Sequence, residues 1–448
     1  MGSRSGDFEI DGDDHEEILE RVAALDIAKA SAKVCVRVPH VSVERRRVTR
    51  VFDVAATTKA IMDLAHELCE ARVERVVMEA TSDYWRPFFY VLEARGLVVW
   101  LVNAKDVKQV PGRPKTDKLD AVWLAKLNER GMLRPSFVPP REIRELRDYT
   151  RLRVDLIHDR SRHAQRLEKL LEDAQIKLSC VVSDILGKSG RDMIEALIAG
   201  ERDPEVLAEM ARGRMRVKQR ALVEALTGSF DAHHGELARI LLDQIDALTA
   251  KVDRLSLRAS ELIEAMPAAQ APDAPSVPAE GPPRPALSAI ERLDEITGIG
   301  ILSSQQIIAE IGLDMSQFPT AGHLVSWAKI SPRTIQSGPR SRSGATGSGN
   351  PYLKRALCEA AMVASRTDTF LGERYRRLAR RRGKLKALVA VARSILVIVW
   401  HLLSDPTARF VDLGSDFYEH RVNKDRRTRD LVRQLQALGH AVTLNPAA

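Results

Sequence analysis

The stretch VVMEATSDYW, residues 76–85, changes from apolar to acidic within four positions. Val76, Val77 and Met78 are typical of a strand that is buried inside a sheet. Glu79 follows them directly, although an ionised carboxylate is costly to bury unless it is paired or binds a metal. We therefore expect a buried strand whose acidic last residue has charged partners elsewhere in the chain.

The sequence around this stretch, from residue 19 to 140, predicts a mixed α/β domain. Its first three strand-like runs are joined by short turns and indicate a meander. The runs with strand character are 22–27, 33–38, 46–54, 75–80 and 97–103, and those with helix character are 57–71, 85–96 and 116–131. Strands and helices in this order favour one mixed sheet covered by helices, the α/β part of an α/β plus α protein.

Residues 141–265 are predicted to form long helices. Apolar residues recur every three or four positions in 141–178, and from Leu241 to Leu262 they step by four and three in strict alternation. That alternation is a heptad repeat and predicts a coiled-coil stalk, paired either within the chain or between subunits. Residues 181–230 also look helical but contain no recognisable motif.

The remaining ranges differ in composition. We expect a disordered acidic N-terminus at 1–18, a Pro/Ala linker at 266–287, a mostly helical domain at 288–403, and a charged tail at 404–448 with a short helix at 424–438. The apolar run 394–403 is too short to span a bilayer, so we expect a core helix and no membrane role.

Composition limits the class of partner. The chain has 448 residues, a formal net charge of +8 and only 5% aromatic residues. A basic balance favours polyanions such as nucleic acid, whereas few aromatic residues argue against stacking on single strands as the main binding mode. Four scattered cysteines without zinc-site spacing predict reduced, buried thiols in a cytoplasmic, nucleoid-associated protein: Cys35, Cys69, Cys180 and Cys358.

Four carboxylates could form a metal site. Asp26 ends the first strand and Glu79 ends the fourth, while Asp117 and Asp120 are three residues apart on one helix and share a face. If these groups meet, they repel one another unless divalent cations neutralise them, and oxygen-only ligation favours Mg²⁺ or Mn²⁺. Two such ions can activate a nucleophile and stabilise a leaving oxygen in phosphoryl transfer.

Each acidic residue also has a simpler interpretation. Asp26 could be a turn residue, and Asp120 could lie on a solvated helix face. Asp117 could help Thr116 to cap its helix. Glu79 is the hardest to explain in this way because the rest of its strand is apolar.

A glycine pair opens the second domain. In TGIGILSSQQIIAEIG, residues 297–312, Gly298 and Gly300 lie between two predicted helices. A helix-hairpin-helix has this form, and its turn amides bind a phosphate. A plain turn between two helices, with a glycine at the C-cap, explains the same pattern.

The segment 331–393 concentrates the basic charge of the chain, with fifteen Lys and Arg against three Asp and Glu. Its first part, 331–357, is rich in glycine and serine and predicts a flexible loop. Five basic residues in this loop favour contact with phosphate backbones: Arg333, Arg340, Arg342, Lys354 and Arg355. A serine among them could attack a phosphodiester, and spacing does not choose between Ser337, Ser341, Ser343 and Ser348.

Taken together, these motifs resemble the IS110 family of insertion-sequence transposases. The resemblance rests on ALDIAKA, MEATSDYW, TDKLDA, ITGIG, IIAEIG and WAKISPRTIQSG with GNPYLKRAL, in this order, and covers about 20–180 and 288–403. It implies a ribonuclease-H-like (RuvC-like) first domain in which Asp26, Glu79, Asp117 and Asp120 are the DEDD metal ligands. It also implies that Ser337 is the nucleophile.

The same resemblance implies partners and a reaction. Ser337 would attack double-stranded DNA at the element ends and target, with Mg²⁺ or Mn²⁺ bound, and leave a covalent phosphoserine–DNA intermediate. A structured guide RNA would supply sequence specificity. The carboxylates and the serine would come from different subunits of a homo-oligomer, a dimer or a tetramer.

Two other functions remain open at this stage. A RuvC-like junction nuclease would need the carboxylates but not Ser337, and a non-catalytic nucleic-acid scaffold would need neither. The chain also departs from the compact family pattern in its longer middle region (about 181–235), its Pro-rich linker and its tail after residue 403.

Overall fold

The computed structural model describes residues 19–40, 42–43, 46–79, 82–103, 117–272, 286–338, 340–420 and 424–444. Contacts divide the chain into two units, Met1–Val138 and Pro139–Ala448, and each is described by itself. The predictions for 1–18, for the Thr116 cap and for most of the Pro/Ala linker lie outside the described residues.

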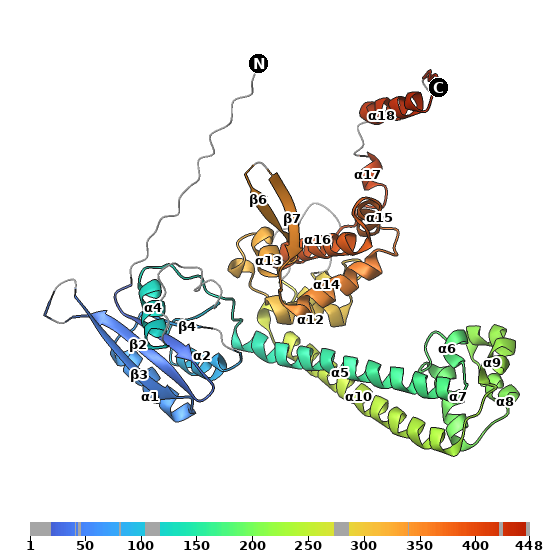
Figure 1. Cartoon of the computed structure of the whole chain (residues 1–448), viewed down its shortest axis with the longest axis horizontal. Coiled ribbons are helices and arrows are strands. Elements are labelled where there is room, and N and C mark those ends of the chain that lie inside the picture. Colours follow the sequence, from blue (N-terminus) through green and yellow to red (C-terminus); the bar gives the residue numbers. More distant parts are fainter. Residues whose placement is uncertain are drawn as a thin grey trace. The chain divides into compact units, whose positions relative to one another are not determined.

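The first unit is built on a five-stranded mixed sheet (Figure 1). The strands are β1 (Val22–Ile27), β2 (Ser31–Pro39), β3 (Arg47–Ala55), β4 (Arg75–Glu79) and β5 (Val99–Val102). Their order is β3-β2-β1-β4-β5, with β1, β2 and β3 antiparallel and β4 parallel to both β1 and β5. This confirms the predicted meander and mixed sheet.

Helices cover both faces of this sheet. The helices are α1 (Thr58–Glu70), α2 (Trp85–Ala94) and α4 (Asp117–Glu129). Because side chains alternate along a strand, Ala23 and Leu25 of β1 pack in one core with α1 and α2, whereas Val22 and Ala24 pack in the other core with α4. Each strand residue is thereby assigned to one face.

Polar contacts fix the C-terminal end of α4 to the sheet. Asn128 is only 1% exposed, and its Nδ2 donates to the backbone carbonyl of Arg75 on β4 at 3.2 Å. Glu129 pairs with Arg37 of β2 at 2.8 Å and with Arg47 of β3 at 3.1 Å. These contacts set which residues of α4 face the sheet.

The second unit begins with two long helices that pack along each other, α5 (Arg141–Asp173) and α10 (Ala232–Glu264) (Figure 1). Each has 33 residues and is therefore about 50 Å long. Ile245, Leu248, Val252 and Ala259 of the predicted heptad seam are buried. The seam therefore packs within the chain, which was one of the two predicted alternatives.

The longer middle region forms a helical cap at the far end of α5 and α10. Its elements are α6 (Leu178–Val181), α7 (Lys188–Ala199), α8 (Pro204–Glu209), η1 (Gly213–Lys218) and α9 (Gln219–Leu226). They enclose an apolar core that includes Met193, Leu207, Leu222 and Leu242 of α10. The part that departs from the compact family pattern is thus a packed structural element.

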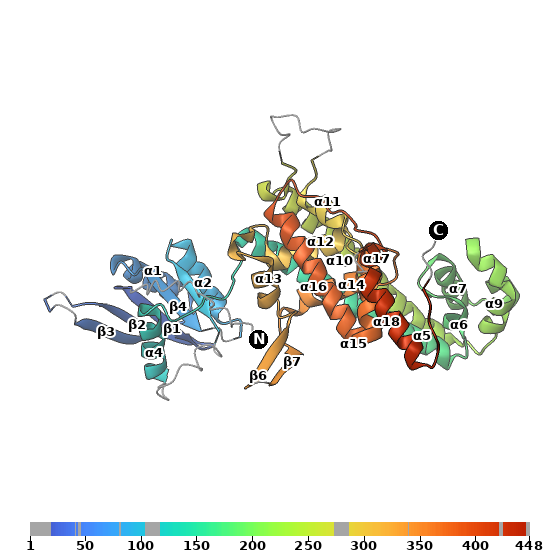
Figure 2. The ribbon, with the colours of Figure 1, turned by 90° about the horizontal axis from the view of Figure 1, so that it is seen from above.

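Four of the described α-helices pack against α16 (Lys384–Ser404): α11 (Ala289–Asp294), α13 (Ala321–Trp327), α14 (Pro351–Ala364) and α15 (Phe370–Arg382) (Figure 2). Helix α12 (Ile301–Ile311) packs against α5, α11 and α14 instead. The remaining elements are η2 (Pro267–Ala269), η3 (Met315–Gln317), α17 (Phe417–His420) and α18 (Lys424–Ala437). By length and composition α16 is able to cross a membrane, so the expectation of an apolar run too short for this is wrong. Its residues Val391, Ile395 and Val399 are fully buried, as expected of a core helix.

The prediction of a flexible loop at 331–357 is wrong. Residues Pro332–Ser337 (β6) and Arg340–Thr346 (β7) form an antiparallel hairpin that stands out from the helices (Figure 1). Cross-strand pairing outweighs the glycine and serine content, and Gly338, at φ +56°, makes the tight turn. At its foot Gly349 has no space for a Cβ, which would lie 2.2 Å from the carbonyl oxygen of Ala328.

The prediction of buried thiols is only partly correct. Cys35 lies in the core beneath α4, and burial raises the pKa of its thiol to about 11. Cys69 and Cys180 are exposed, and Cys358 is intermediate. Exposure follows from their places on helix surfaces, which composition does not reveal.

A buried carboxylate connects the foot of the hairpin to α5. The side chain of Glu310 on α12 is fully buried and accepts two bonds of 2.8 Å from Arg151. It also pairs with Arg147 at 3.3 Å and accepts from Asn350, whose Oδ1 caps α14 through the backbone N–H of Leu353. Both arginines lie on α5, so this network fixes the point at which the hairpin returns into α14.

We predict that Glu310→Ala destabilises the second unit by about 1.5–3 kcal/mol, because it removes the charged acceptor that two partly buried arginines share. Urea unfolding followed by far-UV circular dichroism measures this change. Glu359→Ala is the matched control, since Glu359 forms an exposed pair with Arg355 one turn away and should cost less than about 0.5 kcal/mol. Equal losses in the two variants would contradict a special role for the buried network.

Candidate active site

The paired register of β1 and β4 brings Asp26 and Glu79 together. Leu25 is opposite Met78 in this parallel pair, so the next residues along the two strands, Asp26 and Glu79, are neighbours. Both follow the alternation of Ala24 and Val77 and lie on the face covered by α4. Each side chain is intermediate between buried and exposed. The prediction that these strand ends meet is therefore confirmed at the level of the backbone.

Helix α4 places the other two acidic positions on the same side of the sheet. Asp117 is the first residue of α4 and Asp120 lies one turn further along. Asp120 directly precedes the buried Ala121 and lies one turn before the buried Leu124. The helix packs against β1, β2 and β4. Asp120 is partly buried, whereas the side chain of Asp117 lies outside the described residues.

The residues present fit a divalent cation. Asp26, Glu79 and Asp120 offer only oxygen donors, which suits Mg²⁺ or Mn²⁺. None of the three is fully buried, so water can complete the coordination shell. Three or four carboxylates at one edge also need positive charge nearby to be tolerated.

The hairpin presents Ser337 at its tip. The backbone pairs Ser337 with Arg340 and Ile335 with Arg342, and directly opposed residues share a face. Positions 337, 340 and 342 therefore lie on one face of the hairpin. Arg340 and Arg342 are exposed, while the side chains of Ser337 and Arg333 lie outside the described residues.

The two basic residues of α14 differ from those of the hairpin. Lys354 is partly buried beside the foot of β7, with its Nζ 3.4 Å from Thr346 Oγ1. Arg355 is held by Glu359 at 2.7 Å and by His158 of α5 at 3.3 Å. A phosphate would have to compete with these protein partners for Arg355.

Exposed cations at the junction of α15 and α16 extend the basic surface. Five residues within seven positions are all exposed: Arg380, Arg381, Arg382, Lys384 and Lys386. We call this set the basic elbow. Counting charges along the sequence does not distinguish these exposed residues from arginines that are paired within the protein. Arg376 nearby, for example, is paired with Glu373 at 2.9 Å, which only the structure reveals.

Packing explains Gly298 without a phosphate. Its φ is +93°, and a Cβ there would lie 2.3 Å from the backbone oxygen of Ala360 on α14. Gly300 is exposed at the start of α12, and the nearest atom to a Cβ there is 3.9 Å away. Of the two glycines, Gly300 is therefore the one with open space for a phosphate.

A second group of potential metal ligands lies at the end of α5 and start of α10. Asp173, His233 and His234 bring three ligand atoms within 4.8 Å of one another. His234 Nδ1, however, accepts the backbone N–H of Asp231, and His234 Nε2 lies 3.4 Å from Asp173. Both ring nitrogens of His234 thus have protein partners at the N-terminus of α10. Helix capping therefore explains this group of residues without a metal.

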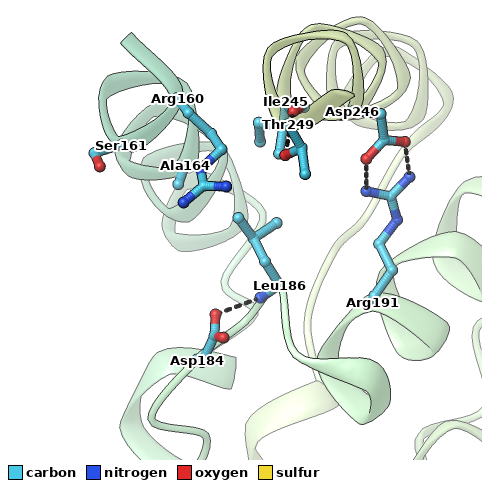
Figure 3. Close-up of a pocket in the computed structure, with 9 residues that line it drawn as sticks. All are labelled: Arg160, Ser161, Ala164, Asp184, Leu186, Arg191, Ile245, Asp246 and Thr249. Atoms are coloured by element: carbon cyan, nitrogen blue, oxygen red, sulfur yellow. Dashed lines mark hydrogen bonds and ion pairs between the residues drawn. The ribbon is translucent and has the colours of Figure 1, made fainter. Parts of the chain in front are cut away.

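A pocket of about 440 Å³ lies between α5, α10 and the loop before α7 (Figure 3). Arg191 projects from α7 toward Asp246 of α10 and donates to both carboxylate oxygens, at 2.9 and 2.7 Å. It also bonds Glu195 at 2.9 Å. The charge of Arg191 is therefore paired within the protein. We interpret the pocket as part of the packing between the helical cap and α10.

Two segments of the chain match family models of transposases. A DEDD family model described as Transposase matches residues 23–176, and the model described as Transposase IS116/IS110/IS902 family matches residues 290–376. Two separate parts of the chain thus match family models of transposases. These matches agree with the motif order in the sequence.

Similarity to individual proteins covers less of this chain than the two family models together. An "Insertion element IS110 uncharacterized 43.6 kDa protein" of Streptomyces coelicolor is 31% identical over 132 residues, 29% of this chain and 30% of the relative's length. Two Thermus thermophilus RuvC structures, one in complex with a Holliday junction substrate, match at 13% and 14% identity over 26% of this chain and 99% of theirs, with TM-scores of 0.21 and 0.20.

We predict that Gly298→Ala destabilises the second unit by about 2 kcal/mol or more, because of the close approach and the left-handed φ. Gly300→Ala should cost less than about 1 kcal/mol, since its φ is extended and space is open. Chemical denaturation of both variants measures the difference. A stable Gly298→Ala protein that loses only nucleic-acid affinity would instead support a phosphate-binding role for this glycine.

Proposed function

We propose that the chain is the transposase of an IS110-type insertion sequence, which exchanges DNA strands through Ser337. The observation that supports this most is the register that sets Asp26 beside Glu79 on the face covered by α4. The two matching family models support it as well.

In this proposal Asp26, Glu79, Asp117 and Asp120 hold Mg²⁺ or Mn²⁺, which supplies positive charge to the reacting phosphate. Ser337 Oγ bonds to phosphorus while the bond from phosphorus to a deoxyribose oxygen breaks. The leaving oxygen keeps the electron pair and gains a proton, which balances the proton that the serine loses. The product is a phosphoserine–DNA intermediate with a free hydroxyl end, and the reverse step joins a new strand.

The basic residues would bind backbones rather than bases. Arg340 and Arg342 share the face of position 337 on the hairpin, so they can contact the phosphates that flank the attacked one. The basic elbow can contact a second stretch of duplex. Sequence specificity would come from a guide RNA, and the carboxylates and serine that act together would come from different subunits of an oligomer.

The alternative is a RuvC-like nuclease that cleaves junctions with metal and water. It uses the same carboxylates and leaves no protein–DNA bond. The two functions therefore differ in one measurable species, the covalent adduct.

We predict that the purified protein, incubated with element-end DNA, its guide RNA and Mg²⁺, forms an adduct that survives denaturing electrophoresis. Ser337→Ala should abolish it, because the attacking oxygen is gone. Ser343→Ala, in the facing strand of the same hairpin, is the matched control and should retain it. Glu79→Gln should lower adduct formation by about 100-fold or more, the scale for losing a group that supports transition-state charge.

Cleavage by the wild type without an adduct would establish the nuclease instead. An adduct that persists in Ser337→Ala would move the nucleophile to another serine. Neither result would alter the assignment of the carboxylates, which Glu79→Gln tests separately.

A further inference from the structure

The row of side chains that contains Asp26 and Glu79 continues across β2 and β3. Asp26 is directly opposite Lys33, and Lys33 is directly opposite Asp53. Lys33 lies on the face covered by α4. Along β2, Cys35 packs in the core beneath α4 and Val34 packs in the core on the other face, so Lys33, two residues before Cys35, shares the face of Cys35. One ammonium group is thus placed between a carboxylate of the candidate metal site and one outside it.

In the structure Lys33 contacts the outer carboxylate. Its Nζ lies 2.6 Å from Asp53 Oδ1. The Lys33 side chain is 23% exposed and that of Asp53 is 64% exposed, so the pair is largely solvated and adds little to the stability of the fold. Its effect is to set where the lysine charge is held.

That position matters for a divalent cation at Asp26. Cross-strand neighbours on one face lie within reach of a long side chain, so Lys33 can turn to Asp26 when Asp53 does not hold it. An ammonium group bonded to Asp26 would occupy oxygens that a metal needs, and the two positive charges would repel each other. Binding to Asp53 and binding to Asp26 are alternatives for one flexible lysine.

We propose that Asp53 is a positioning residue that holds Lys33 away from Asp26, so that the ammonium group does not compete with a divalent cation for the Asp26 carboxylate. This rests on the proposed function, because it takes Asp26 as a metal ligand. Sequence patterns did not reveal the pair, since Lys33 and Asp53 are 20 residues apart and only strand register makes them neighbours.

The test is Mn²⁺ binding to the full-length protein, followed by the electron paramagnetic resonance signal of free Mn²⁺. Asp53→Asn should weaken binding by about three- to fivefold, the change that corresponds to an exposed ion pair. Lys33→Met should bind as well as the wild type or more tightly. The double variant should match Lys33→Met, because without the lysine there is nothing for Asp53 to hold.

Glu67→Gln is the matched control. Glu67 forms an exposed pair with Arg50 at 2.8 Å, between α1 and β3, on the opposite face of the same sheet. Glu67→Gln removes the same unit of negative charge as Asp53→Asn and should leave Mn²⁺ binding unchanged. A loss equal to that of Asp53→Asn would show that only net charge matters and would overturn the proposal.

Three further results would overturn the proposal, and they are distinguishable. If Asp26→Asn weakens Mn²⁺ binding but Asp53→Asn does not, the metal site stands and the positioning role is wrong. The same holds if the double variant binds as weakly as Asp53→Asn. If neither Asp26→Asn nor Glu79→Gln affects Mn²⁺ binding, the metal site of the proposed function itself is wrong.

Discussion

The candidate site depends on one constraint, the pairing register between β1 and β4. Because side chains alternate along a strand, a shift of one residue would turn Asp26 or Glu79 to the face covered by α1 and α2. The apolar residues that precede them, Ala24 and Val77, hold the register by packing against α4. The same packing brings Asp120 to this face. Core and candidate site are thus fixed by one set of contacts.

The second unit carries the proposed nucleophile, Ser337, on the hairpin of β6 and β7. The foot of this hairpin is fixed by Gly349 and Asn350. Glu310 ties that foot to α5, where burial also lowers the pKa of Arg153 to about 10 beside Gln305. A buried ionic network at this point favours a defined geometry over raw stability.

Sequence patterns predict the first unit well because β1, β4 and β5 are short apolar runs and apolar residues recur at every second position of β2. The face of Glu79 follows from counting alternate residues back through Val77. The sequence did not predict the hairpin, because its glycine and serine content hides the alternation of side chains along β6 and β7. The packing role of Gly298 could not be predicted, because its contact with Ala360 joins residues 62 positions apart. Exposure of Cys69 likewise depends on packing that composition cannot give.

The central claim is that Asp26, Glu79, Asp117 and Asp120 bind one group of divalent cations. Anomalous diffraction from a crystal of the protein soaked in Mn²⁺ tests it most directly. The account predicts a peak at the ends of β1 and β4, within about 2.0–2.6 Å of carboxylate oxygens from these residues. A peak bound instead by Asp173 and the two histidines, with none beside Asp26 and Glu79, would contradict it.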